Sequence, residues 1–337
     1  EEKTLFDPTF AGVSTFLIYF GNTFANYLRD ANEKKQIRGA FSQYLSPALV
    51  EQLAEDPDKL VLGGETKKMT FLFCDVRGFT TISESFKSDP QGLTKLINRF
   101  LTPLTNEIIN VNGTIDKYMG DCIMAFWNAP IDVEGHEKMA CDATLRMHKV
   151  MAELNAEREK EAKSENRKYL ELKIGIGLNT GGCVVGNMGS DQRFDYSVLG
   201  DSVNLAARLE GQSKSYGVKT VIGPETNECV KDLYATLQLD MIAVKGKKEA
   251  VTIFTLAGDS EFKKSSEYKT LETKHKNILK NYFNQEWQNC LKEMNIAKSL
   301  CNNLMNEYYE IMTKRIDEFK TSPPPKDWDG VYVATSK

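Results

Sequence analysis

Two aspartates stand at the edges of short apolar segments that have the length and composition of buried strands. Asp75 follows the apolar residues 71–74, and Asp121 directly precedes the apolar residues 122–126. Carboxylates at neighbouring strand edges can hold two divalent cations side by side, and hard oxygen ligands of this kind suit Mg²⁺ or Mn²⁺. The pattern therefore predicts metal-dependent phosphoryl chemistry, in which a pair of ions stabilises the attacking and the leaving oxygen. The alternative is that both aspartates only cap loops.

Composition allows one large domain with accessory segments. The chain has 337 residues, of which 41% are hydrophobic, and its formal net charge is −4. This charge does not indicate a nucleic-acid partner, so local basic residues must carry any phosphate binding. The seven cysteines form no C-x-x-C pair and lie in apolar runs, which predicts reduced core cysteines in a cytosolic domain. The scattered histidines indicate neither a zinc site nor a histidine-based nucleophilic site.

The N-terminal region is long and uncharged. Residues 8–28 carry no charged side chain, and basic residues follow at positions 29, 34, 35 and 38. Such a stretch can cross a hydrocarbon core of about 30 Å, and the basic flank then places the rest of the chain in the cytosol. We expect residues 1–28 to form a membrane-spanning or membrane-proximal helix and residues 29–62 to form a helical linker. The protein would lie at the cell membrane with its catalytic domain in the cytoplasm.

The alternative for this region is a soluble amphipathic helix that packs on a partner chain. Polar residues at positions 14, 22 and 26 interrupt the apolar stretch. In a membrane they are tolerable only on a side that faces protein.

Residues 63–257 alternate strand and helix patterns. Strands are expected at 68–75, 114–118, 121–127, 170–178, 183–188, 220–222, 233–244 and 250–256, and helices at 90–111, 134–162 and 201–216. This order predicts an α/β (α+β) fold with a ferredoxin-like β-α-β-β-α-β core, extra strands and helices mainly on one face. A long helix, broken near Ser46 and Pro47, is expected before this core over residues 9–55.

Residues 258–337 change character. Apolar side chains recur at helical spacing between positions 282 and 312, and three prolines follow at 323–325. The pattern predicts a C-terminal helical hairpin that ends at the prolines.

Four short segments together carry a family resemblance. Residues 75–80, 117–121, 200–208 and 244–247, in this order, resemble the catalytic domain of class III nucleotidyl cyclases over about residues 40–257. Residues 37–47 resemble the linker of bacterial membrane-anchored adenylate cyclases that carry an N-terminal extracellular sensor domain. The resemblance implies an enzyme that converts ATP to 3′,5′-cyclic AMP and pyrophosphate with two Mg²⁺ or Mn²⁺ ions per active site.

The resemblance also assigns roles at the metal site and on the following helix. Asp75, Asp121 and the peptide carbonyl of Val76 would bind the metal ions. Asn204 would orient the ribose, and Arg208 would stabilise charge on the α-phosphate. Asn204 and Arg208 are spaced i, i+4 and therefore share one helix face. The alternative for Arg208 is a surface ion pair with Glu210 or Asp201.

Further residues are expected to contact the triphosphate. By resemblance Lys245 would bind the β- and γ-phosphates, and Arg193 is a weaker candidate for a phosphate contact. Backbone amides near Phe79 and Thr80, at the expected start of a helix, can receive an anion.

Two residues are expected to read the base. Lys117 is a donor only, so it pairs with the acceptor N1 of adenine, whereas N1 of guanine carries a hydrogen. Ser197 occupies the second base-reading position, where many relatives have aspartate. Its hydroxyl can accept from the adenine 6-amino group, but it can also donate.

The resemblance implies a homodimer. In this family the metal-binding aspartates and the residues that read the base lie on opposite sides of a dimer cleft, and this chain contains both sets, which predicts two equivalent sites about a twofold axis. Two alternatives stay open, a guanylate or mixed-specificity cyclase and a catalytically inactive regulatory homologue.

Overall fold

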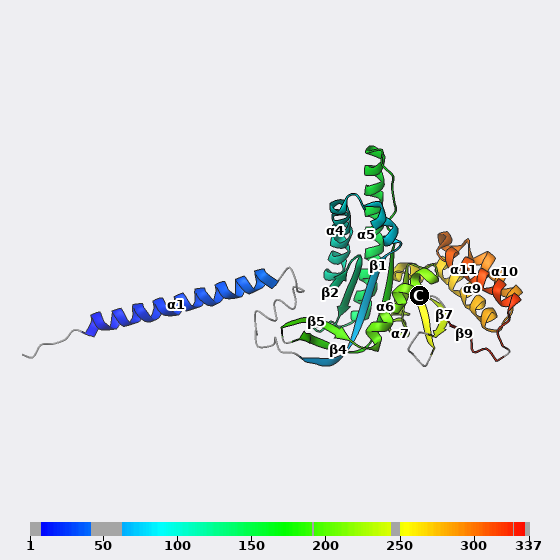
Figure 1. The fold of residues 1–337 in the computed structure, drawn as a ribbon. Coiled ribbons are helices and arrows are strands. Elements are labelled where there is room, and N and C mark those ends of the chain that lie inside the picture. Colours follow the sequence, from blue (N-terminus) through cyan, green and yellow to red (C-terminus); the bar gives the residue numbers. More distant parts are fainter. Residues whose placement is uncertain (1–7, 42–62, 191, 244–249, 326, 334–337) are drawn as a thin grey trace, which may run out of the picture. The chain divides into compact units, whose positions relative to one another are not determined.

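The chain divides into two compact units, Glu1–Val61 and Leu62–Lys337. The computed structural model describes residues 8–41, 63–190, 192–243, 250–325 and 327–333 (Figure 1). In the first unit the described residues form one helix, α1 (Pro8–Phe41). Its large hydrophobic side chains are exposed, and the rings of Phe16, Phe20 and Phe24 stack along one side of the helix. The expected break near Ser46 and Pro47 and most of the 29–62 linker lie outside the described residues.

The expected membrane-spanning helix over residues 1–28 is not supported. Across the described parts of the chain, no helix combines the length and the apolar character that crossing a bilayer requires. In α1 hydroxyl and amide side chains are interspersed among the aromatic ones, and the hydroxyls of Thr15 and Thr23 donate to backbone carbonyls of the same helix. The absence of charge therefore overstated the apolar character of this segment. The cellular location stays a prediction.

The second unit is built on one mixed sheet. Its described strands follow the order β2-β3-β1-β4-β6-β8-β7-β9, and β5 pairs with β4. Their bounds are β1 Gly63–Val76, β2 Thr114–Met119, β3 Cys122–Trp127, β4 Ile174–Ser190, β5 Arg193–Leu199, β6 Thr220–Ile222, β7 Ala235–Ala243, β8 Val251–Gly258 and β9 Val331–Val333. The neighbours β4, β1, β3 and β2 are antiparallel and have the order of a ferredoxin-like core. The predicted mixed α/β fold is confirmed.

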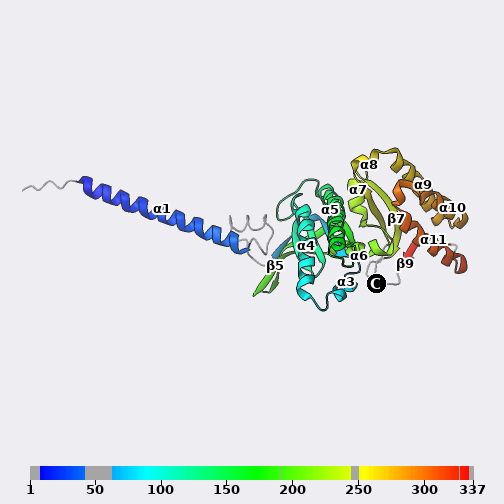
Figure 2. The same ribbon diagram turned by 90° about the horizontal axis from the view of Figure 1, so that it is seen from above.

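Successive residues of β1 face opposite sides of the sheet, as the period of a strand requires. Leu72 and Cys74 join a core with α4 (Pro90–Ile109) and α5 (His136–Ser164), which lie side by side on one face (Figures 1 and 2). Phe71 and Phe73 join a second core with β5 and α6 (Asp201–Ser215). The sheet is therefore covered on both faces around β1, whereas helices mainly on one face were expected.

A glycine lets α6 lie directly on the sheet. A Cβ atom at Gly177 of β4 would lie 2.2 Å from the backbone nitrogen of Glu210, far closer than any side chain tolerates. Any larger residue at position 177 would push α6 away from β4. This close approach sets the height of α6, and with it the positions of Asn204 and Arg208, above the strands.

The C-terminal segment is part of the same sheet and core. It comprises α8 (Ser260–Lys264), α9 (Ser266–Phe283), α10 (Trp287–Ala297), a 3₁₀ turn (Leu300–Asn303) and α11 (Asn306–Thr321). These helices share a hydrophobic core with β7 and β8, and β9 pairs in parallel with β7. The expected hairpin, which ends at the prolines, corresponds to α10 and α11, whereas α9 and strand β9 are additional elements that the sequence pattern did not predict.

Candidate active site

Asp75 and Asp121 come together where strand β1 ends beside the β2–β3 turn. Asp75 is near the end of β1, and Asp121 lies in the tight turn between β2 and β3, where Gly120 adopts φ 68°. Strands β1 and β3 are antiparallel neighbours, so the end of β1 meets this turn. The backbone N–H of Val76 donates to Asp121 Oδ2 at 3.3 Å. The predicted metal-binding residues are therefore adjacent.

The electrostatics of this pair fit a cation site. Burial, together with the negative charge of Asp121, raises the pKa of Asp75 to about 6. Two carboxylates held together in a partly buried place repel each other unless a cation or a proton lies between them. No cluster of three or more His, Cys, Asp or Glu side chains suited to a metal occurs in the described ranges. A cation here would therefore need other oxygens, such as the Val76 carbonyl and substrate phosphates, to complete its ligands.

A further carboxylate, which sequence reasoning did not assign to the site, faces the same place. Burial and the charge of Asp75 raise the pKa of Glu210 to about 7, although Arg77 acts in the opposite direction. Glu210 Oε1 lies 2.9 Å from the position that a Cβ atom of Gly175 would take, and Gly175 is the partner of Asp75 across β1 and β4. Glu210 therefore interacts electrostatically with Asp75, and its raised pKa means that it is partly protonated near neutral pH.

Asn204 and Arg208 share the outer face of α6. Both side chains are exposed, whereas Leu205, Ala206 and Leu209 are buried against the sheet. Within the described residues Arg208 makes no ion pair, so the pair with Glu210 or Asp201 is not formed. Positions 208 and 210 are about 200° apart around a helix.

The base-reading candidates meet at an aspartate. Ser197 of β5 donates its hydroxyl hydrogen to Asp116 Oδ2 at 2.7 Å, and Lys117 Nζ lies 3.2 Å from Asp116 Oδ1. Lys117 is exposed, whereas the Asp116 side chain is 0% exposed. Burial raises the pKa of Asp116, and the Ser197 hydrogen bond and the Lys117 charge partly offset this rise. Sequence reasoning placed Lys117 and Ser197 in the site but missed Asp116, which joins them.

The structure describes only some of the other residues that are predicted to contact the phosphates. Phe79 and Thr80 begin the short helix α3 (Phe79–Ser85). The Phe79 ring packs against the core that β1 forms with α4 and α5, so only the backbone of Phe79 is available to bind a phosphate. The side chain of Arg193, at the start of β5, and all of Lys245 lie outside the described parts of the structure.

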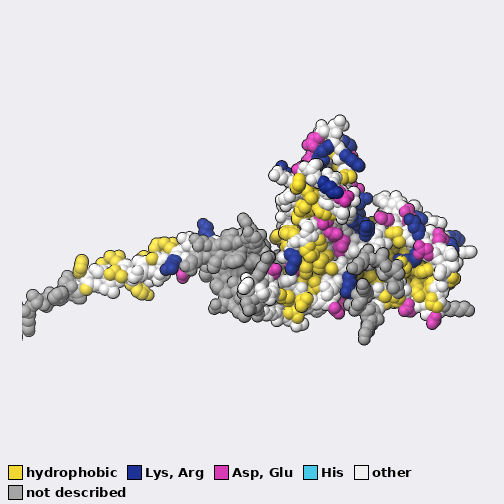
Figure 3. Space-filling model, viewed as in Figure 1, with side chains coloured by type: hydrophobic (Ala, Val, Ile, Leu, Met, Phe, Trp, Pro, Cys, Tyr) yellow, Lys and Arg dark blue, Asp and Glu magenta, His cyan; other side chains and the backbone are white. Residues whose placement is uncertain are grey.

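Large hydrophobic side chains are exposed beside the base-reading strands. Hydrophobic side chains gather on the face that carries α4, β2 and β5 (Figure 3). Exposed large residues on these elements are Ile109, Tyr118, Met119 and Leu199. A surface of this kind is typical of an interface with another chain.

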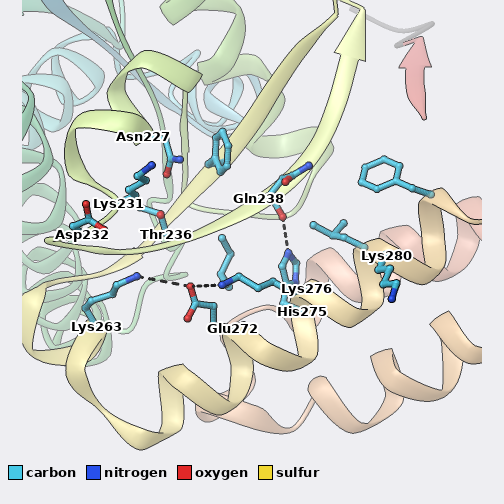
Figure 4. A pocket seen from close by; sticks show the side chains of 14 residues that line it. Asn227, Lys231, Asp232, Thr236, Gln238, Lys263, Glu272, His275, Lys276 and Lys280 are labelled. Carbon is cyan, nitrogen blue, oxygen red and sulfur yellow. Dashed lines mark hydrogen bonds and ion pairs between the residues drawn. The ribbon is translucent and has the colours of Figure 1, made fainter. Parts of the chain in front are cut away.

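A cleft elsewhere in the second unit does not have the properties of the active site. It has a volume of about 520 Å³ and lies among β7, β8, α9 and α7 (Pro224–Val230) (Figure 4). Glu272 lies between Lys263 and Lys276, at 3.8 and 3.1 Å, and His275 is hydrogen-bonded to the carbonyl of Gln238. The lining includes none of the residues predicted for catalysis.

Comparisons with known proteins show the family of this chain. The model of the adenylate and guanylate cyclase catalytic domain matches residues 63–258. An adenylate cyclase of Anabaena cylindrica is 30% identical over 231 residues, which cover 66% of this chain and 44% of that protein. Adenylate cyclase 1 of Rhizobium meliloti is 29% identical over 192 residues, which cover 57% of this chain and 28% of that protein. The chain thus spans less than half the length of these two relatives.

Solved structures have the same fold. An adenylyl cyclase from P. aeruginosa is 36% identical with a TM-score of 0.50, and the match covers 57% of this chain and 95% of that one. A guanylyl cyclase is 31% identical with a TM-score of 0.51, and the match covers 59% of this chain and 96% of that one. Because the family model matches more than half of the chain, this chain belongs to the family of adenylate and guanylate cyclase catalytic domains.

Proposed function

We propose that this protein is an adenylate cyclase that converts ATP to 3′,5′-cyclic AMP and pyrophosphate at sites shared by two copies of the chain. The observation that carries the proposal is the adjacency of Asp75 and Asp121 at the sheet edge, next to a helix that presents Asn204 and Arg208. In the reaction the ribose 3′-oxygen loses its proton and bonds to the α-phosphorus. The bond from that phosphorus to the bridging oxygen breaks, and pyrophosphate leaves.

Asp75, Asp121 and the Val76 carbonyl would hold two Mg²⁺ or Mn²⁺ ions. When bound, such ions make the 3′-hydroxyl more acidic and offset the charge of the triphosphate. The raised pKa of Asp75 supports this assignment, because a cation would relieve the repulsion between the two carboxylates.

The remaining residues position the substrate. Asn204 would hold the ribose, and the guanidinium of Arg208 would stabilise negative charge on the α-phosphate in the transition state. Lys245 would bind the β- and γ-phosphates, with Arg193 and the amides near Phe79 and Thr80 as additional contacts.

Two features support a homodimer. Arg208 is exposed on the face of α6 turned away from the sheet, whereas Glu210 of the same helix faces Asp75. Arg208 is therefore placed to serve a nucleotide held by another copy rather than by its own Asp75. The exposed hydrophobic residues on α4, β2 and β5 supply a surface for that contact.

A guanylate or mixed-specificity cyclase is the main alternative. A lysine at position 117 disfavours it, because lysine has no acceptor for the N1 hydrogen of guanine. A catalytically inactive homologue is the other alternative, and the joint presence of Asp75, Asp121, Asn204 and Arg208 argues against it.

Product analysis tests the proposal. Purified protein is incubated with ATP or GTP, each with Mg²⁺ or Mn²⁺, and the products are separated by chromatography. We expect cyclic AMP and pyrophosphate from ATP, with much less cyclic GMP from GTP. Equal or preferred use of GTP would overturn the substrate assignment, and no cyclic nucleotide from either substrate would overturn the proposed activity.

A further inference from the structure

Asp116 lies at an irregularity of the β2–β3 ladder. The pairing passes from Ile115 with Ala125 to Lys117 with Met124, so Asp116 has no partner on β3. An extra residue of this kind forms a β-bulge, which changes the direction of the local side chains. Here the Asp116 side chain is buried against β5, where Ser197 contacts it.

One carboxylate therefore contacts both candidate base readers. The Ser197 hydroxyl donates to Oδ2 at 2.7 Å, and Lys117 Nζ lies 3.2 Å from Oδ1. Oδ1 is buried and makes no hydrogen bond of regular geometry within the described residues, so the Lys117 ammonium is its electrostatic partner. Removing Asp116 would release both side chains at once.

The direction of the Ser197 hydrogen bond has a chemical consequence. A serine hydroxyl has one hydrogen to donate and two lone pairs to accept with. When the hydrogen is given to Asp116, the Ser197 oxygen can only accept from a nucleobase. The 6-amino group of adenine donates, whereas the 6-oxo group of guanine accepts, so the oriented hydroxyl matches adenine and mismatches guanine.

We propose that Asp116 is a positioning residue that fixes Ser197 as a hydrogen-bond acceptor, holds Lys117 beside it, and so sets the preference for adenine over guanine. The inference rests on the proposed adenylate cyclase function. Through the Ser197 hydroxyl, the carboxylate at position 116 would act on the base that the serine contacts.

A purely structural role for Asp116 makes a different prediction. If the hydrogen bond only satisfies a buried carboxylate, its loss changes the use of both nucleotides by the same factor. If Asp116 orients Ser197, its loss frees a hydroxyl that can serve either base. The ratio of kcat/KM for ATP to kcat/KM for GTP therefore separates the two roles, because general damage to the fold does not change this ratio.

The experiment measures this ratio for the wild type, Asp116→Ala, Ser197→Ala and Asp116→Ala with Ser197→Asp. The control is Asp195→Asn, which removes an exposed carboxylate from the same strand. Loss of one matched hydrogen bond corresponds to about tenfold in such a ratio. We expect Asp116→Ala to lower the ratio about tenfold or more, the double variant to restore most of it by moving the carboxylate to position 197, and Asp195→Asn to leave it unchanged.

An unchanged ratio in Asp116→Ala, with a melting temperature near that of the wild type, would overturn the inference. If Asp116→Ala does not fold, the same ratio measured for Ser197→Ala tests the inference. A serine fixed as acceptor favours ATP, so its removal must lower the ratio, whereas a freely rotating hydroxyl serves both bases and its removal leaves the ratio unchanged. A wild type that forms no cyclic nucleotide would instead refute the proposed function, which is a distinguishable result.

Discussion

Arg315 of α11 binds Asp240 of β7 through a buried ion pair, with Arg315 Nη1 at 2.5 Å from Asp240 Oδ2. The Asp240 side chain is 0% and the Arg315 side chain 7% exposed. The Tyr216 hydroxyl also donates to Asp240, at 2.6 Å, and the Arg315 guanidinium lies over the ring of Tyr332, 3.6 Å from its centroid. These contacts connect the C-terminal helices to the catalytic sheet.

Breaking this pair from one side is expected to destabilise the second unit strongly. Arg315→Met leaves a buried carboxylate without its cation, which costs about 3–5 kcal/mol of unfolding free energy. Urea denaturation followed by circular dichroism measures the change. Combining Arg315→Met with Asp240→Asn removes both charges and should recover most of the loss.

The matched control for this prediction lies on the same helix. Lys320 pairs with Asp317 at 2.9 Å, and both side chains are exposed. Lys320→Met should cost less than about 1 kcal/mol. A loss no larger than this for Arg315→Met would contradict the view that the buried pair anchors the C-terminal segment.

Neutralising either metal-site aspartate is expected to abolish turnover without harming the fold. Asp75→Asn or Asp121→Asn removes a cation ligand, and we expect a fall in kcat of roughly a hundredfold or more. Stability without divalent cations should stay level or rise, because burial and repulsion from Asp121 raise the pKa of Asp75 to about 6, so a charge at position 75 is unfavourable. Cyclic AMP assays and thermal unfolding in EDTA measure both effects.

Asp132→Asn is the control for these variants. Asp132 is exposed and paired with Lys67, so its neutralisation should change neither the turnover nor the stability. Near wild-type turnover by Asp75→Asn would show that this carboxylate does not bind a catalytic cation.

The base preference is expected to follow residues 117 and 197. Lys117→Glu with Ser197→Cys replaces the donor at adenine N1 by an acceptor, which suits the N1 hydrogen of guanine. The double variant should use ATP less well and gain some use of GTP. Steady-state kinetics with both nucleotides measure the shift, and full retention of the ATP preference would exclude Lys117 as a base reader.

Acid is expected to weaken the C-terminal core through His275. Burial lowers the pKa of His275 to about 4, against 6.5 in the unfolded chain. Between pH 4 and pH 6.5 the unfolded state binds more protons at His275 than the folded state does. The stability that His275 contributes is therefore complete above pH 6.5 and is lost as the pH falls toward 4. Lowering the pKa of His275 from 6.5 to about 4 corresponds to about 3 kcal/mol of stability.

Urea denaturation at several pH values tests this prediction. His275→Gln should show a shallower loss of stability between pH 6.5 and pH 4 than the wild type. Some dependence should remain, because burial also lowers the pKa of His148 to about 3. An identical slope in the variant and the wild type would show that His275 does not couple protonation to folding.

The strand and helix periods of the sequence predict where four residues of the proposed site lie. Asp75 and Asp121 could be placed because each borders an apolar run, and Asn204 and Arg208 because their i, i+4 spacing puts them on one helix face. Glu210 was considered only as a partner for Arg208. The two lie on different sides of α6, and only the packing of α6 on Gly177 reveals that Glu210 faces Asp75.

Other features depended on tertiary structure in ways that no local pattern records. Asp116 was missed because a bulge breaks the two-residue period of β2, and nothing in the chain marks where a bulge falls. Strand β9 has only three residues, Val331–Val333, and forms because β7 offers it an open edge. The membrane span was overestimated because the length and the lack of charge were given more weight than the polar side chains that interrupt this segment.

Mixing two inactive variants tests the shared site most directly. Asp75→Ala and Arg208→Ala homodimers should each be nearly inactive, because each lacks one part of both sites. In a heterodimer one site carries both lesions and the other is intact. A statistical mixture is half heterodimer, so co-expression should recover about a quarter of wild-type cyclic AMP formation. Activity that stays at the level of the two parents would contradict a site built from Asp75 of one copy and Arg208 of another.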